Sequence, residues 1–374
     1  MKRGLVLATL ILVGGLSAAV MGFQGPPAGQ GAPAGPRGGG PGGAPGGPGG
    51  GAPGGPGAGA PGGGQRGGAP QALNTIKVRD NLYMIANGGG NTGIFIMANG
   101  VALVDTKNPN NGQGIMDEVR KVTNKPITMV INTHTHADHT GSNEFFTDNV
   151  VFVAHEGTKA NMEKMTNFAG DKAKFLPSRV YKDTLTIGTG ADQIMLYYFG
   201  RAHTNGDSFV VFPAIRAMHA GDAFASKGFP LVDGNNGGSL VDYGKTLATA
   251  ASTIKNVDTI INGHIVTGPT PFADLQIYAD FNKDLLAYVQ DSVKANKTLD
   301  QATADYKFPE KYVPLGYTAP APGGRGGPAA VIRAGYVELG APVPPAAAPA
   351  GPGGGAPGGP GGARGGAPGG ARGQ

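Results

Sequence analysis

The sequence predicts an α/β protein of four layers, αββα, in which two β-sheets face each other and helices cover both outer faces. Gly and Pro are concentrated at the two ends of the 374-residue chain, and residues 74–316 have an ordinary globular composition. Within that stretch, apolar runs of strand length fall into two groups, and each group is followed by segments with helical periodicity. Two sheets, each covered on one face by helices, satisfy this order.

The ends of the chain differ sharply from its centre. Residues 25–70 contain 23 Gly and 11 Pro, and residues 319–374 contain 19 Gly and 11 Pro. Such segments have too little apolar surface to offset the entropy of ordering a chain. An apolar island at 331–339 is the one part of the C-terminal flank that could pair back onto the domain. We expect four regions: a signal peptide over 1–22, a Gly/Pro-rich disordered segment over 23–73, one folded domain over 74–316 and a Gly/Pro/Ala-rich disordered tail over 317–374.

The first residues indicate export. Lys2 and Arg3 precede an uncharged apolar run that reaches Gly22, and the small residues 17–19 suit signal-peptidase cleavage. An uncleaved membrane anchor is the alternative, because the run nearly reaches spanning length. We therefore expect a periplasmic or secreted protein, whose Gly/Pro flanks could contact the cell envelope or wall.

Charge and cysteine content exclude several function classes. The formal net charge is +5, but residues 74–316 hold 22 basic and 24 acidic side chains, so the basicity belongs to the flanks. No nucleic-acid partner is expected, since the folded part lacks a basic excess and the Arg-Gly-Gly steps of the flanks have no interleaved aromatic residues. The absence of Cys excludes disulfides, thiolate metal sites and cysteine nucleophiles. A small-molecule substrate fits better, and the oligomeric state stays open.

The expected elements follow the chain in order. Apolar runs between Gly/Asn turns predict strands, and apolar residues that recur every three or four positions predict helices. A Thr-x-x-Gln capping box at residues 298–301 starts one further helix. The expected strands are 82–85, 93–97, 101–105, 127–131, 150–154, 194–198, 208–212, 215–219 and 259–261, and the expected helices are 114–122, 157–165, 239–254 and 277–289.

Four potential metal ligands follow the buried strand at 127–131 within six residues. His134 and His136 are two positions apart, so in an extended stretch they point the same way and can bind one ion. Asp138 and His139 lie beyond a turn and can face a second ion. Neutral imidazoles so clustered are typical metal ligands.

This His-x-His-x-Asp-His pattern resembles the signature of the metallo-β-lactamase superfamily. The resemblance implies the αββα sandwich and two Zn²⁺ ions per chain, with Fe or Mn as the alternative metals. It also implies three later ligands in the family's order: His203 in a Gly-x-x-His-Thr-x-Gly-Asp turn, Asp222 as the bridging carboxylate, and His264 on the second metal. Because the chain has no Cys, the branch with a Cys ligand is excluded. The pattern is closest to glyoxalase II-like and quinoprotein-associated exported hydrolases.

Other polar residues near these motifs have weaker assignments. Asp105 ends a predicted strand, where it would orient the His loop. Lys227, Asn236 and Ser239 are candidate substrate contacts, although Ser239 also fits a helix N-cap. We expect neither of the remaining imidazoles, His155 and His219, to bind metal.

The resemblance and the ligand set together predict a dinuclear zinc hydrolase. A hydroxide shared by the two metals would attack a small ester, thioester, lactone or lactam outside the cytoplasm. Asp138 would act catalytically by orienting that hydroxide and taking a proton. The alternatives are a β-lactamase proper, or a phosphodiesterase or nuclease on the same fold.

Overall fold

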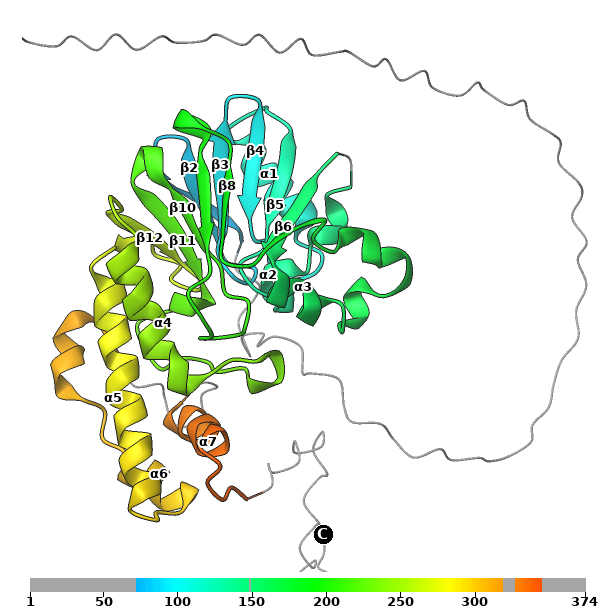
Figure 1. Ribbon diagram of the computed structural model, residues 1–374. Helices are drawn as coiled ribbons and strands as arrows, with labels where there is room; N and C mark the ends of the chain where they lie inside the picture. The colour runs from blue at the N-terminus through cyan, green and yellow to red at the C-terminus, as the bar shows by residue number, and fades with distance from the viewer. Residues whose placement is uncertain (1–71, 148, 319–326, 345–374) are drawn as a thin grey trace, which may run out of the picture. The chain divides into compact units, whose positions relative to one another are not determined.

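The structure is a computed structural model that describes residues 72–147, 149–318 and 327–344 (Figure 1). The expected signal peptide at 1–22 and almost all of the Gly/Pro-rich segment at 23–73 lie outside these residues. So do residues 319–326 and 345–374 of the C-terminal flank. Within the described ranges, no helix is long and apolar enough to cross a membrane.

Two sheets form the centre of the domain. The first has seven strands in the order in which they occur along the chain, antiparallel from β1 to β4 and parallel from β4 to β7. A parallel step needs a crossover, and α1 (Gly112–Arg120) provides the one between β4 and β5. The strands are β1 (Asn74–Arg79), β2 (Leu82–Ala86), β3 (Thr92–Met97), β4 (Gly100–Val104), β5 (Ile127–Ile131), β6 (Val151–His155) and β7 (Arg179–Tyr181).

The second sheet has six strands in the order β13-β12-β11-β10-β9-β8. Only β11 and β12 pair in parallel, and α4 (Leu240–Thr253) connects them. The strands are β8 (Thr184–Ile187), β9 (Ile194–Tyr197), β10 (Phe209–Phe212), β11 (Ala217–Gly221), β12 (Thr259–Asn262) and β13 (Thr270–Pro271).

Three buried apolar clusters separate the layers. One joins side chains of both sheets, such as Phe95 and Phe212, whose ring centroids are 4.6 Å apart. A second lies between the first sheet and its helices, and a third lies between the second sheet and α4 with α5 (Asp274–Lys294). Figure 1 shows α4 and α5 together beside β11 and β12. The predicted αββα architecture is confirmed.

Most expected elements occur within a few residues of their predicted bounds. The predicted capping box also forms: the Thr298 side chain accepts from the Gln301 N–H, and the Gln301 side chain accepts from the Thr298 N–H at the start of α6 (Leu299–Asp305). Four strands, β1, β7, β8 and β13, were not predicted. Each lies at a sheet edge, and much of each is exposed, so the apolar signal of burial is weak.

The C-terminal boundary at 316 is wrong in part, because the flank expected to be disordered contains a packed helix. Helix α7 (Pro328–Glu338) buries Val331, Ile332 and Tyr336 against α5 and α6. The carboxylate of Glu338 accepts hydrogen bonds from the Ser239 hydroxyl and the Val241 N–H. The apolar island at 331–339 therefore belongs to the domain, since its side chains complete a core that α4 and α5 leave open.

Candidate metal centre

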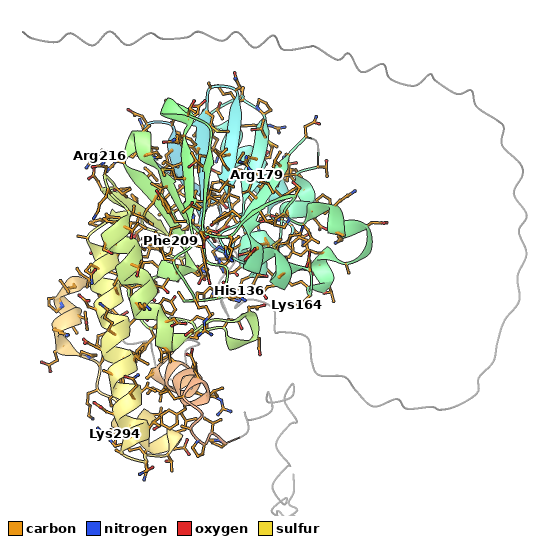
Figure 2. The ribbon with its side chains drawn as sticks, viewed as in Figure 1. His136, Lys164, Arg179, Phe209, Arg216 and Lys294 are labelled. Carbon is orange, nitrogen blue, oxygen red and sulfur yellow. The ribbon has the colours of Figure 1, made fainter. Side chains whose placement is uncertain are left out.

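Seven side chains converge where strands of both sheets end. His134 and His136 follow β5, and Asp138 and His139 lie on the one-turn helix α2 (Ala137–Thr140). Figure 2 shows His136 at the end of the sandwich that faces α2 and α3 (Glu156–Met162). From the second sheet come His203, between β9 and β10, then Asp222 after β11 and His264 after β12. The ligand-type atoms form two groups, within each of which all lie less than 4.8 Å apart: His134, His136, His203 and Asp222 in the first, and Asp138, His139 and His264 in the second.

Most of the first group is buried, and the His136 side chain is its exception at 21% exposed. His136 Nδ1 and His203 Nε2 face each other at 2.9 Å, and His203 Nε2 lies 3.7 Å from Asp222 Oδ2. His134 Nε2 lies 4.0 Å from the same carboxylate oxygen. The rings of His134 and His203 have no exposed surface. Three imidazole nitrogens and one carboxylate oxygen thus lie within 4.8 Å of one another, and zinc is bound by ligands of these types.

The second group is more open. His139 Nε2 and His264 Nε2 are 3.4 Å apart, and His264 Nε2 is 3.4 Å from Asp138 Oδ2. Asp222 also reaches this group, since its Oδ1 lies 3.3 Å from His139 Nε2 and its Oδ2 3.2 Å from His264 Nε2. The Asp222 carboxylate therefore lies between the two groups, the position predicted for a bridging ligand.

Two properties of the imidazoles in the first group suit metal binding. His134 Nε2 is buried and has no hydrogen-bond partner in the protein, a costly state that a bound cation would relieve. Burial, followed by the neighbouring His139 and His203, holds the pKa of His134 well below its usual value. Burial, with the nearby His136, lowers the pKa of His203 to about 4. Both rings are therefore neutral, the form in which imidazole binds metal.

Backbone and carboxylate groups hold the outer ring nitrogens. Asp105 Oδ2 lies 2.7 Å from His139 Nδ1, and the same carboxylate accepts from the N–H and hydroxyl of Thr133, so Asp105 contacts the His loop as expected. His203 Nδ1 lies 2.8 Å from the Leu231 carbonyl oxygen. Such contacts fix the tautomer and orientation of a metal-binding imidazole.

Asp233 is a residue that the sequence analysis missed. Its Oδ2 lies 2.7 Å from His136 Nε2, the nitrogen that points away from the first group. Burial disfavours charge on His136, but the Asp233 hydrogen bond and the nearby Asp222 outweigh this and raise the pKa of His136. Only the position of Asp233 in the loop after Asp222 could have indicated this role, and many loop aspartates share that feature.

The three predicted substrate contacts have structural partners. Lys227 Nζ pairs with Asp274 at 2.9 Å and donates to the Leu315 carbonyl, and Ser239 caps α4 by accepting from the Asp242 N–H. Asn236 Nδ2 donates to Asp233 Oδ2 at 2.6 Å. These contacts favour the N-cap interpretation of Ser239 and disfavour Lys227 as a substrate residue. Asn236 supports His136 through Asp233, and its contact with substrate stays a prediction.

The remaining imidazoles lie outside both groups. His155 caps α3 by accepting from the Gly157 N–H. His219 Nδ1 accepts from the Gly221 N–H, and its Nε2 lies 3.0 Å from the Asn91 carbonyl oxygen. Both therefore have structural contacts that account for them.

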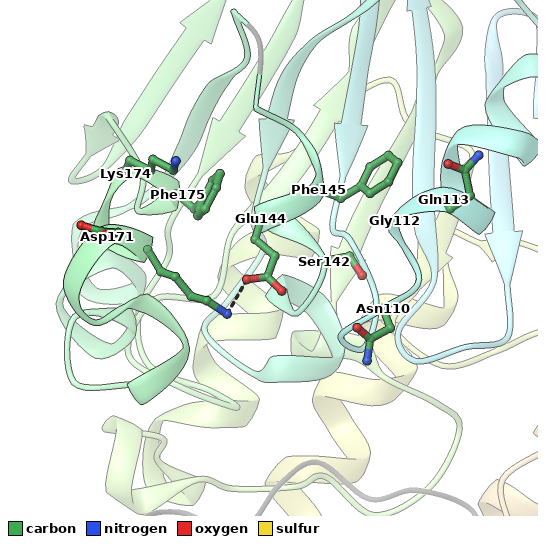
Figure 3. A pocket seen from close by; sticks show the side chains of 10 residues that line it. Asn110, Gly112, Gln113, Ser142, Glu144, Phe145, Asp171, Lys174 and Phe175 are labelled. Carbon is green, nitrogen blue, oxygen red and sulfur yellow. Dashed lines mark ion pairs between the residues drawn. The ribbon is translucent and has the colours of Figure 1, made fainter. Parts of the chain in front are cut away.

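A separate pocket of about 470 Å³ lies beside α1 (Figure 3). Its lining includes Gln113, Ser142 and Phe145, and Lys172 there is ion-paired with Glu144. None of the seven ligand-type residues lines it. This pocket is therefore distinct from the candidate metal centre.

Comparisons with known proteins agree with the geometry. The family profile described as "Metallo-beta-lactamase superfamily" matches residues 86–264, which include all seven side chains. "Metallo-beta-lactamase type 2" of Elizabethkingia meningoseptica is 26% identical over 200 residues, covering 50% of this chain and 77% of the relative. "Metallo-beta-lactamase IND-1" of Chryseobacterium indologenes is 24% identical over 153 residues, covering 41% of this chain and 61% of the relative.

Solved structures show the same fold. The stereoselective inverting sec-alkylsulfatase Pisa1 from Pseudomonas sp. superposes with a TM-score of 0.60 at 16% sequence identity. The match covers 71% of this chain but only half of the alkylsulfatase. From the matching family profile, the fold and the ligand-type residues, residues 86–264 of this chain form a hydrolase domain of the metallo-beta-lactamase superfamily.

Proposed function

We propose that this protein is a dinuclear zinc hydrolase. His134, His136 and His203 would hold the first ion, and Asp138, His139 and His264 the second. The position of Asp222 carries the proposal, because one buried carboxylate lies within 4.0 Å of imidazole nitrogens of both groups. Nitrogen and carboxylate ligands without sulfur suit zinc, and Fe or Mn are the alternatives. Two bound zinc ions supply Lewis acidity and an activated water at neutral pH.

The substrate would approach from the side of the second group. His264 is 36% exposed and the Asp138 side chain 17%, whereas in the first group His134 and His203 are fully buried and His136, at 21%, is the most exposed. Of the carboxylates among the proposed ligands, Asp138 is thus the one with substantial solvent exposure. We assign it the task of orienting the attacking water and accepting a proton at its carboxylate.

The proposed substrate is a small ester, thioester, lactone or lactam. A β-lactam is the second candidate, because both curated relatives named above are metallo-beta-lactamases. The near-neutral balance of residues 74–316, with 22 basic and 24 acidic side chains, argues against a nuclease or phosphodiesterase. From the charged and apolar residues at its N-terminus we further propose that the protein is exported to the periplasm or beyond, where its flanks would contact the envelope.

Metal analysis and a substrate panel test the proposal. The full chain, purified without chelator, should contain two zinc ions, and EDTA should abolish hydrolysis that added zinc restores. The panel should include lactam, lactone, thioester, carboxylic ester, alkyl sulfate and phosphodiester substrates. Protein that binds no metal under any loading condition would refute the proposal, as would metal-loaded protein that hydrolyses only phosphodiesters.

A further inference from the structure

Lys107 is a buried cation whose contacts the proposed chemistry does not use. Its side chain has no exposed surface, and its Nζ donates to the carbonyl oxygens of Ile85, at 2.8 Å, and Gly90, at 2.9 Å. Among the described residues, no carboxylate forms an ion pair with Lys107. Burying an ammonium group without a counter-ion is costly, so its two carbonyl contacts must compensate. Burial accordingly lowers the pKa of Lys107 to about 7.

The carbonyl contact at Gly90 links Lys107 to residues 88–91, the glycine loop, which in turn contacts the second ligand group. The Gly90 N–H donates to the Asp138 carbonyl at 2.9 Å. The next residue, Asn91, donates through its N–H to the Gly263 carbonyl at 2.7 Å and through its side chain to the Ile265 carbonyl at 2.8 Å. The loop thus binds the backbone at Asp138 and on both sides of His264.

The same loop packs directly against the ring of His139. A Cβ atom added to Gly90 would lie 2.1 Å from His139 Cε1, so only glycine fits between the loop and the imidazole. Asp105 contacts the outer nitrogen of this ring, and the Thr106 N–H donates to the His139 carbonyl at 2.7 Å. The segment 105–107 therefore holds His139 from one side and, through Lys107 and Gly90, from the other.

We propose that Lys107 is a positioning residue for the second metal, acting through the backbone of Gly90. It fixes the glycine loop, and the loop fixes the geometry of Asp138, His139 and His264. The inference rests on the proposed dinuclear function. It predicts that loss of the Lys107 contacts weakens binding of the second metal and not of the first, because none of these contacts involves His134, His136 or His203.

The test is Lys107→Met, which keeps an unbranched side chain only one heavy atom shorter and removes its donors. Zinc titration of the metal-free full chain should show the second equivalent bound about 10- to 100-fold more weakly, with the first unchanged. The matched control is Lys125→Met, since Lys125 is an exposed lysine that donates to the Met97 carbonyl. Both equivalents should bind to the control as in the unaltered chain. Equal weakening of both equivalents in Lys107→Met, or no weakening, would overturn the inference.

A second variant covers the case in which Lys107→Met does not fold. Gly90→Ala should displace His139 and abolish the second equivalent while the first is retained. Gly228→Ala is its control, because a Cβ at this buried glycine would meet its nearest neighbour at an ordinary 3.6 Å. Retention of both equivalents by Gly90→Ala would overturn the inference while leaving the proposed function intact. Fewer than two equivalents in the unaltered chain would instead overturn both.

Discussion

The two ligand groups differ in their access to solvent and in what holds them. In the first group His134 and His203 are fully buried and the His136 side chain is 21% exposed, whereas the second group contains His264, which at 36% is the most exposed of the seven ligand-type side chains. A substrate would therefore reach the centre over His264 more readily than over His134 or His203.

The supports of the two groups come from different parts of the chain. His136 follows a first-sheet strand, yet its outer nitrogen contacts Asp233, which follows the second-sheet strand β11. His139 is held by Asp105 and the glycine loop, both from the first-sheet half. Both groups therefore depend on the docking of the two halves. The first depends on it through Asp233, and the second through the hydrogen bonds of Asn91 to the backbone on both sides of His264.

Asp222→Asn should have the largest effect, because this carboxylate serves both groups. The substitution removes a negative charge that would offset two dications. Hydrolysis should fall by roughly a hundredfold or more, and the second zinc should be lost before the first. Circular dichroism should be unchanged, since the sheets do not depend on this side chain. Two bound zincs with full activity would show that Asp222 is only a turn residue.

Asp233→Ala should weaken the first group alone. Loss of the carboxylate frees the His136 ring, and zinc affinity at that group should fall about 10- to 100-fold by titration. Asp233→Asn, which keeps an acceptor for His136 Nε2, should recover part of the loss. The exposed Asp171→Ala is the control. A purely structural role for Asp233 would instead lower the melting temperature without changing the ratio of the two affinities.

His219 should make the metal-free protein less stable in acid. Burial lowers its pKa to about 4, below the usual value near 6.5, so the unfolded chain binds a proton that the folded chain does not. Above about pH 6.5 this imidazole does not reduce the free energy of unfolding. As the pH falls from there towards 4, it lowers the free energy of unfolding by up to about 3 kcal/mol. Urea unfolding at several pH values should show that the free energy of unfolding declines less steeply with falling pH in His219→Gln than in the unaltered chain. Identical slopes would contradict the assignment.

Deletions of the flanks should have the smallest effects on both groups. Removing residues 25–70 and 346–374 should leave melting temperature and hydrolysis unchanged, because such segments cannot form a core. Removing residues 327–374 instead should lower the melting temperature, since α7 buries Val331, Ile332 and Tyr336. Equal stability of the two truncated proteins would mean that α7 does not contribute to the core.

The sequence alone determined the layers and the candidate ligands. Apolar periodicity reflects burial. It predicted most strands of both sheets, and most of the helices that cover them, to within a few residues. The first ligands are also visible locally, because their residue types and their spacing directly after a strand already indicate a metal site. These residues are His134, His136, Asp138 and His139. The edge strand β8 was missed because its exposed residues carry little of that periodicity.

Only the tertiary structure decided what supports those ligands. Asp233 and Lys107 lie 97 and 32 positions from the ligands they serve, His136 and His139, and ordinary loop sequence surrounds them. Their partners are fixed by how the two halves dock and how the glycine loop folds over a ring. No periodicity or spacing encodes such contacts, because they join residues whose separation along the chain is arbitrary. The same reason hid the docking of α7, because its buried side chains pack against residues of α4, α5 and α6 that lie far from it in the sequence.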